Sequence, residues 1–328
     1  MHRSYTAARE HAAWLGRTDR GRIVVSGADR APYLQGLLTN DNAALKPGTG
    51  CYSAYLTPQG RMIADMLVYE LGDVVLMTVH RDVTSTVLAR FDQFLFSEDV
   101  KLGDVSDTFA QIAVVGPEAA DVVAGLVSGV PAPTLRALGE HGNVRVDLDG
   151  SPAIVTRTTD LGEPGFDVFV AADRPLRLDI PELTAGEAET LRIEGGVPLF
   201  HRDMDEETIP LEAGIESRAI SFTKGCYVGQ EVIIRVLHRG HGRVARRLVQ
   251  LRIDGSDVPA RGAVIRAADK DVGHVTSAAF SPRFSQPIAL GYVQRDFAEP
   301  ETSVLISSSS AGGNDSRLSS ARVTQRIS

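Results

Sequence analysis

The pattern of the sequence changes at Gly242, and this change constrains the fold more than any other feature. Beyond it, apolar and β-branched runs alternate with Gly, Pro and Asp, and no apolar spacing of helical period occurs. Short strands with regular turns are typical of a small β-barrel or sandwich. We therefore predict a C-terminal β-barrel at residues 242–328, with a mobile Ser- and Gly-rich loop near 307–316. Its six strands are expected at Val244–Ile253, Ala263–Ala267, Val272–Ser277, Ile288–Val293, Val304–Ser307 and Ala321–Ile327.

Before Gly242, strands and helices are mixed, and the strands come in hairpins. Helical spacing is found at Asp82–Phe96 and Glu187–Ile193. This mixture favours α+β domains of the split βαβ kind over a doubly wound parallel sheet. Because 328 residues exceed one compact core, residues 1–241 are expected to hold two interleaved domains, with an inserted domain at about 45–136. The hairpins are predicted at Met62–Leu71 with Val74–Val79 and at Val144–Leu148 with Ala153–Thr158.

Charge and composition exclude several classes of protein. A net charge of -8 disfavours a protein that grips nucleic-acid backbone, so direct nucleic-acid binding is not expected. The N-terminus lacks the continuous apolar core of a secretory signal, and no window reaches the roughly 20 apolar residues of a membrane span. Two cysteines form no disulfide framework, so a cytoplasmic location is expected. A local basic stripe is equally well explained as a solvated face: Arg235, His238, Arg239, His241, Arg243, Arg246 and Arg247.

The segment Lys224–Glu231 concentrates residues that can carry chemistry. Lys224 is a cation that would favour the thiolate of Cys226, although Glu231 could oppose it. A free cysteine is otherwise most often a small buried hydrophobe. Cys226 together with His238 and His241 offers too few ligands at too wide a spacing for a structural zinc site, so no metal site is expected.

Two further groups contain carboxylates where apolar residues would be ordinary. Glu194 ends an apolar helix before two glycines and could accept two parallel hydrogen bonds from a heterocycle, or pair with Arg192. Asp65 interrupts an apolar strand and shares one face with Tyr69, four residues on. A buried aspartate there either bonds to backbone amides or has a function.

Four segments resemble the folate-binding YgfZ family and its relative, the aminomethyltransferase, or T-protein, of the glycine cleavage system. The most specific is Lys-Gly-Cys-Tyr-Val-Gly-Gln-Glu at residues 224–231. The resemblance implies a three-domain, T-protein-like arrangement around a central hole that holds tetrahydrofolate or a one-carbon derivative. The similarity runs from about residue 21 to residue 293, and the supporting segments are Leu34–Asp41, Thr57–Arg61 and Ile209–Gly214.

The resemblance also implies roles for single residues. Glu194 falls where the T-protein glutamate clasps the pterin ring. Tyr52, Asp65 and Tyr69 fall on folate-site positions, with Asp65 matching the carboxylate proposed as general base. The loop at residues 157–163 departs from the T-protein pattern, because it reads Arg-Thr-Thr-Asp-Leu-Gly-Glu where T-proteins have Arg-Thr-Gly-Tyr-Thr-Gly-Glu.

Three functions remain open on these grounds. YgfZ membership implies a folate-dependent factor that assists maturation or repair of iron–sulfur enzymes, linked to tRNA modification, with Cys226 and Lys224 at its reactive site. Retained Asp65 implies an aminomethyl or methyl transferase instead. The third alternative is a non-catalytic folate-binding module.

Overall fold

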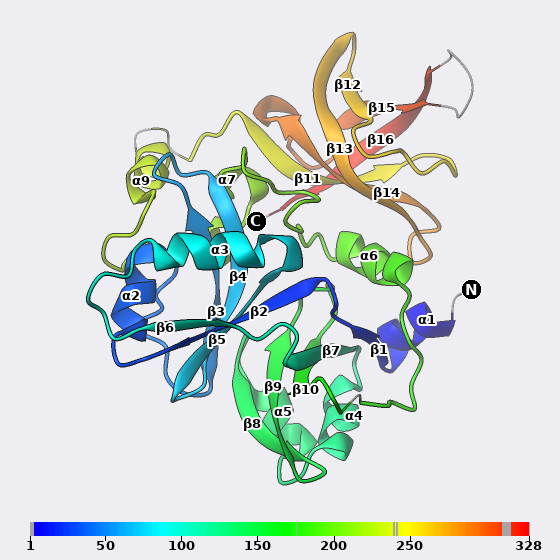
Figure 1. Cartoon of the computed structure of the whole chain (residues 1–328). Coiled ribbons are helices and arrows are strands. Elements are labelled where there is room, and N and C mark those ends of the chain that lie inside the picture. Colours follow the sequence, from blue (N-terminus) through cyan, green and yellow to red (C-terminus); the bar gives the residue numbers. More distant parts are fainter. Residues whose placement is uncertain (1–2, 175, 239, 241, 310–315, 328) are drawn as a thin grey trace.

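The computed structural model describes residues 3–174, 176–238, 240, 242–309 and 316–327. It contains two five-stranded antiparallel sheets and a closed six-stranded barrel, so the chain is α+β (Figure 1). Within the described part of the chain, no helix has the length and apolar character needed to cross a membrane.

The first sheet has the strand order β3-β4-β5-β2-β6. Its two predicted central strands are confirmed, and their hairpin turns at Gly72, whose φ of 102° suits glycine. Helices from two distant parts of the sequence cover one face with a common apolar core. The strands are β2 (Arg20–Ser26), β3 (Thr49–Leu56), β4 (Met62–Glu70), β5 (Val74–His80) and β6 (Lys101–Asp104). The helices are α2 (Arg30–Leu37), η1 (Arg81–Val83), α3 (Thr84–Asp92), α7 (Pro210–Ala213), α8 (Glu216–Ala219) and α9 (Gln230–His238).

The second sheet has the order β1-β7-β10-β9-β8. The second predicted hairpin is its β8–β9 pair. The strands are β1 (Ala13–Gly16), β7 (Phe109–Val115), β8 (Asn143–Leu148), β9 (Ser151–Thr158) and β10 (Gly165–Ala171). The associated helices are α1 (Arg3–Glu10), α4 (Ala119–Leu126), α5 (Ala132–Ala137) and α6 (Ala185–Glu194).

The predicted insertion at about 45–136 does not coincide with either sheet. Strands β3 to β6 pair with β2, so residues 45–104 belong to the same sheet as residues 20–26. The second sheet begins with β1 and resumes at β7, and the chain crosses between the sheets twice before α6. Sheet pairing therefore sets the boundary near residue 105.

All six predicted C-terminal strands form, and they close into a barrel of order β11-β14-β13-β12-β15-β16. The mobile loop expected near 307–316 overlaps the β15–β16 pair, whose register runs to Ser309 opposite Ser316. Residues 310–315 lie outside the described residues. The elements are β11 (Arg246–Ile253), β12 (Val264–Ala267), β13 (Lys270–Ser281), β14 (Gln286–Gln294), η2 (Arg295–Phe297), β15 (Ser303–Ser309) and β16 (Ser316–Arg326).

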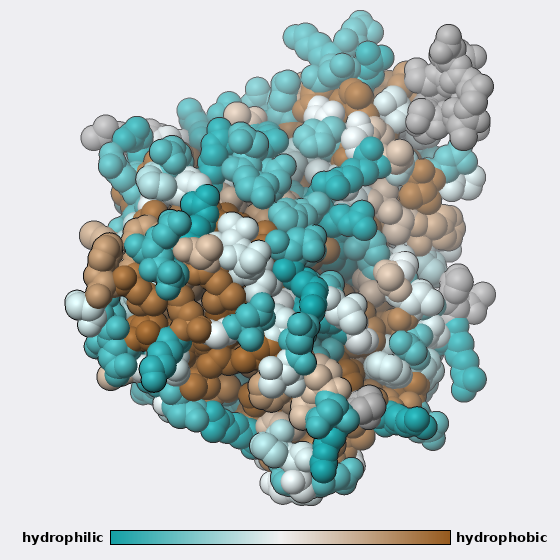
Figure 2. Space-filling model, in the orientation of Figure 1, coloured by the Kyte–Doolittle hydropathy of each residue, from teal (hydrophilic) through white to brown (hydrophobic). Residues whose placement is uncertain are grey.

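Strand β4 is buried on both faces along its whole length. One face packs under α2 and α3, while Leu67 and Tyr69 on the other face pack against Phe169 of the second sheet. The rings of Tyr69 and Phe169 meet edge to face at 6.3 Å. Hence Asp65, on this inner face, lies between the sheets. Figure 2 shows apolar side chains also reaching the surface over α2 and β6.

Candidate functional site

Two adjoining cavities lie where the first sheet, the β1–β2 turn, α6 and the chain at 197–202 meet. The larger has a volume of about 480 Å³, within the usual range for small-molecule sites. The smaller, about 30 Å³, has room for a water molecule but not for a ring-sized ligand. The residues that line both are Arg20, Asp160, Val197 and Pro198.

Asp65 lines the smaller cavity together with Tyr52. Tyr52 lies on the neighbouring strand β3, and its hydroxyl donates a hydrogen bond of 2.7 Å to Asp65 Oδ2. Burial raises the pKa of Asp65, and the charge of Arg20 and the Tyr52 hydrogen bond only partly oppose that rise. A carboxylate with a raised pKa and one fixed donor is suited to accepting a proton.

A buried ionic cluster separates Asp65 from the larger cavity. Arg20 Nη2 lies 3.1 Å from Asp160 Oδ2, and Arg17 Nη1 lies 3.8 Å from the same oxygen. Although burial favours the neutral acid, the two guanidinium groups outweigh it and hold the pKa of Asp160 below its ordinary value. Asp160 is the charged residue by which the loop at 157–163 departs from the T-protein pattern, and it lines the smaller cavity together with Asp65.

Glu194 does not line either cavity. Its carboxylate is buried and accepts hydrogen bonds from Tyr5 Oη at 2.8 and 2.9 Å and from Ser281 Oγ at 2.5 Å. The side chains of α6 that line the larger cavity include Glu189 and Arg192 instead. With 3.6 residues per turn, a side chain five positions after Glu189 points roughly 140° away from it, so Glu194 faces α1 and the barrel. The expected pairing of Glu194 with Arg192 is absent, because Arg192 contacts Glu189 and Asp203.

Tyr69 shares the inner face of β4 with Asp65, as its spacing predicts, but it lines neither cavity. Burial raises its pKa well above the ordinary value. Its ring packs on Phe169 and holds the two sheets together.

Cys226 is exposed, on the loop before α9, whereas Cys51 is half-buried. The charge of Lys224 is not directed at the Cys226 thiol, contrary to what the sequence suggested. Its ammonium donates to the backbone carbonyls of Gln35, Leu38 and Asn40 at the end of α2. Burial lowers the pKa of Lys224 to about 8, and the cysteine that influences it is Cys51.

Three of the sequence segments singled out above converge around this loop. Lys224 caps the segment at 34–41, and Gly229 packs on the segment at 57–61. A Cβ at Gly229 would lie 2.5 Å from the carbonyl oxygen of Thr57, and its φ of 86° also favours glycine. Gly225 has open space around it and no such restriction. The segment at 224–231 is therefore held by its lysine and its second glycine, while Cys226 faces solvent.

Sequence reasoning missed several residues of the larger cavity. The cavity is lined by residues from the β1–β2 turn and the start of β2, from the end of β5, from η1 and from the loop after α6: Arg17, Arg20, His80, Asp82 and His201. The signal available in the sequence was weak, since polar residues at strand ends are common. Arg239 and His241 of the basic stripe lie outside the described residues; Arg235 pairs with Glu231 on α9 and Arg246 with Glu212.

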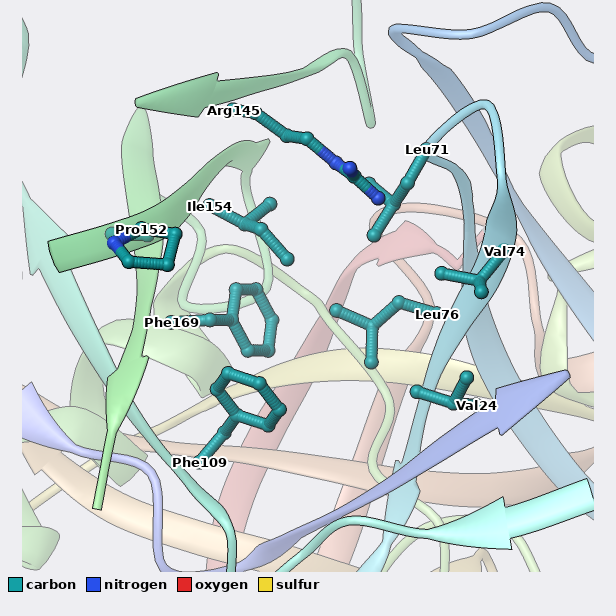
Figure 3. Close-up of a pocket in the computed structure, with 10 residues that line it drawn as sticks. Val24, Leu71, Val74, Leu76, Phe109, Arg145, Pro152, Ile154 and Phe169 are labelled. Atoms are coloured by element: carbon teal, nitrogen blue, oxygen red, sulfur yellow. The ribbon is translucent and has the colours of Figure 1, made fainter. Parts of the chain in front are cut away.

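A third cavity of about 220 Å³ lies between the two sheets (Figure 3). Its lining is apolar apart from Arg145, whose guanidinium bonds to Asp73. Without a free acid or base, this cavity does not match the chemistry expected of a one-carbon site.

The comparisons with known proteins agree along the chain. Residues 1–224 match the GCVT N-terminal domain, and residues 246–314 match the glycine cleavage T-protein C-terminal barrel domain. The chain is 31% identical over 296 residues to an aminomethyltransferase of Rubrobacter xylanophilus, covering 88% of this chain and 78% of that protein. It is 30% identical over 311 residues to one of Streptomyces coelicolor, covering 91% and 82%.

The fold is also similar to a solved structure. The glycine cleavage system aminomethyltransferase T from Bartonella henselae superimposes with a TM-score of 0.86 at 22% identity, covering 98% of this chain and 87% of that one. Since the GCVT N-terminal domain matches more than half of the chain, and a relative is 31% identical over 88% of it, the chain belongs to the aminomethyltransferase family of the glycine cleavage T-protein.

Proposed function

We propose that the chain binds tetrahydrofolate in the larger cavity and assists maturation or repair of iron–sulfur enzymes through Cys226. The observation that carries the proposal is the exposed Cys226 on a loop that is otherwise firmly anchored to α2 and to the turn after β3. Membership of the YgfZ branch, and a client in tRNA modification, rest on the segment at 224–231.

The chemistry of the cavity supports a reduced folate as ligand. Folate joins a flat ring with adjacent N–H donors to a tail of carboxylates. Asp65 and Glu189 offer acceptors for the ring, while Arg17 and Arg202 offer donors for the tail. Entry of the ring next to Asp65 requires the Arg20–Asp160 pair to move, because only about 30 Å³ is open there. Direct contact between Glu194 and the ring requires this end of α6 to rearrange, because Tyr5 and Ser281 donate to the carboxylate and Arg9 lies 3.4 Å from it.

Exposure suits Cys226 to meeting a protein client. Phe222, four residues earlier in the same loop, is also exposed, with 52% of its surface accessible, so the loop offers both a thiol and an apolar ring to solvent. Exposed thiols react where buried ones do not. The raised pKa of Cys51, about 12 because of burial, makes that second thiol a poor nucleophile at neutral pH.

Aminomethyl transfer is the second candidate. The specific observation in its favour is that Asp65 is buried and accepts a hydrogen bond from Tyr52, an environment that suits a general base. The Arg20–Asp160 pair beside it weighs against unchanged T-protein chemistry, since it occupies the approach to Asp65.

One set of variants separates these functions. Tetrahydrofolate binding is measured by calorimetry for the wild type, Asp65→Asn and Cys226→Ser, with the exposed Asp92→Asn as control. Removing the Asp65 charge should cost about 1.5–3 kcal/mol, roughly ten- to a hundredfold in affinity. Cys226→Ser and Asp92→Asn should bind as the wild type does.

Activities of iron–sulfur enzymes are then compared in strains that carry each variant. Cys226→Ser should abolish support, and Cys51→Ser should not. Full support by Cys226→Ser would defeat the accessory role. Turnover of methylene-tetrahydrofolate with an amine donor, lost in Asp65→Asn, would establish the transferase instead, and binding without either activity would leave a folate-binding module.

A further inference from the structure

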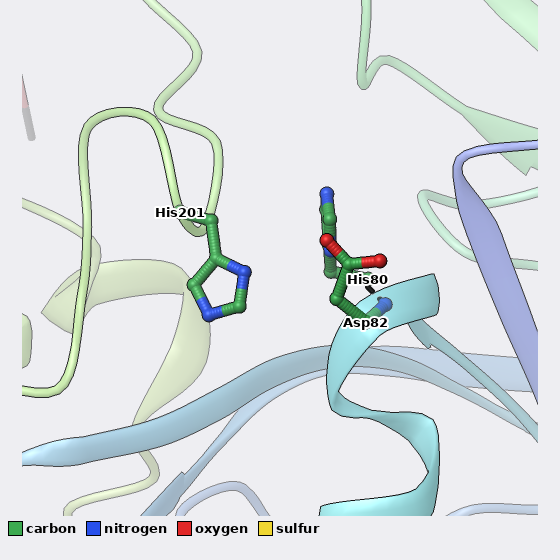
Figure 4. A group of neighbouring side chains, drawn as sticks. All are labelled: His80, Asp82 and His201. Carbon is green, nitrogen blue, oxygen red and sulfur yellow. Dashed lines mark hydrogen bonds and ion pairs between the residues drawn. The ribbon is translucent and has the colours of Figure 1, made fainter.

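Two histidines and an aspartate meet at one wall of the larger cavity (Figure 4). His80 ends β5, Asp82 lies in η1, and His201 comes from the loop after α6. One ligand atom from each lies within 4.8 Å of the others. The two imidazole rings are 5.1 Å apart.

His201 is oriented by a contact on its far side. Its Nε2 lies 3.4 Å from Glu206 Oε1, and Figure 4 shows the other ring nitrogen turned toward His80 and Asp82. Metal-bound histidines almost always have a carboxylate or carbonyl on the nitrogen that does not bind the ion. The backbone of His201 has φ of 64°, a costly conformation for a non-glycine residue that points its ring into this cluster.

His80 and Asp82 can converge on an ion with small movements. Nδ1 of His80 accepts a long 3.3 Å hydrogen bond from the Asp82 amide, so its lone pair is unprotonated and weakly held. The same atom lies 3.7 Å from Asp82 Oδ2, on a side chain that is 74% exposed and free to turn. Ligand atoms at about 2.0–2.2 Å from one ion lie somewhat closer together than this cluster, so side-chain rotation suffices.

We propose that His80, Asp82 and His201 bind one divalent first-row transition ion, with Glu206 supporting His201. Imidazole nitrogens favour Zn²⁺, Fe²⁺, Co²⁺ or Ni²⁺ over Mg²⁺ and Ca²⁺, which prefer oxygen ligands. Two histidines and one carboxylate leave coordination positions free. Since all three residues line the larger cavity, those positions face it and are open to an anionic ligand. This inference does not depend on folate binding.

The full-length protein is titrated with Zn²⁺ by calorimetry and with Co²⁺ by visible absorption. We expect one ion per chain, with Co²⁺ d–d bands typical of mixed nitrogen and oxygen ligands. His80→Asn keeps an acceptor for the Asp82 amide, and His201→Asn tolerates positive φ, so both variants should fold. Each, and Asp82→Asn, should weaken binding at least about tenfold, and Glu206→Gln should weaken it less.

His11→Asn is the matched control, because His11 is an exposed histidine that contacts Glu118 and does not line the larger cavity. This variant should bind the metal ion as the wild type does. Mg²⁺ should not compete. Absence of stoichiometric binding, or binding that survives the double substitution His80→Asn/His201→Asn, would overturn the site.

Discussion

At the scale of single residues, Asp167 is a carboxyl group whose ionised form is destabilised by burial in the folded protein. It lies on β10 with no surface exposed, accepts a hydrogen bond from Gln111 Nε2 at 2.9 Å, and lies 3.9 Å from Arg17. Burial raises its pKa to about 6, although the charge of Arg17 opposes the rise. Its pKa in the unfolded chain is near 3.9.

The raised pKa of Asp167 makes this residue more stabilising in acid than at neutral pH. Because the folded pKa is the higher one, Asp167 contributes its full stability below about pH 4 and loses it as pH rises through about 6. Relative to Asp167→Asn, the wild type should therefore lose up to about 3 kcal/mol between pH 4 and pH 7.5. Urea unfolding of both proteins across this range measures the difference. A difference that stays constant with pH would contradict the raised pKa.

At the scale of elements, α6 carries Glu189 and Arg192 to the cavity, and a capping box defines its start. Thr184 Oγ1 accepts from the Glu187 amide at 3.2 Å, and the Glu187 carboxylate accepts from the Thr184 amide at 2.9 Å. Thr184→Ala should cost about 1 kcal/mol of unfolding free energy, and Thr184→Ser should restore it. Hydrogen exchange should show faster opening of the first turn of α6 in the Ala variant. Equal exchange in both variants would mean that packing alone sets the helix start.

At the scale of the whole molecule, one buried carboxylate joins the core to the barrel. Asp203 Oδ2 lies 2.6 Å from Arg192 Nη1, and Oδ1 accepts from Thr276 and Ser277 of β13. Asp203→Ala leaves the Arg192 charge buried with fewer partners, which should cost about 3–5 kcal/mol. In Asp203→Ala, thermal unfolding and limited proteolysis should show the C-terminal barrel unfolding or being cleaved before the two sheets are affected. Asp296→Ala, an exposed carboxylate of the barrel, should change neither, and an unchanged barrel in Asp203→Ala would refute this junction.

Local pattern was enough to predict part of this molecule. The barrel strands follow from turn residues and β-branched runs, and each hairpin pairs neighbours in the chain. Helix α9 was missed because Gln230–His238 follows a glycine-rich segment that resembles a loop. The segment at 224–231 pointed to Cys226 and suggested that Lys224 favours its thiolate, whereas the Lys224 ammonium instead donates to carbonyls at the end of α2.

The sequence by itself determined the barrel, the mixed character of the first 241 residues, and Asp65 as a polar residue on an apolar strand. These depend on periodicity and on contacts between near neighbours. Only the tertiary structure decided that Glu194 turns toward Tyr5, that Arg20 and Asp160 stand before Asp65, and that His80 and Asp82 meet His201. Such arrangements depend on how helices rotate and how distant loops pack, and no local preference of the chain encodes them.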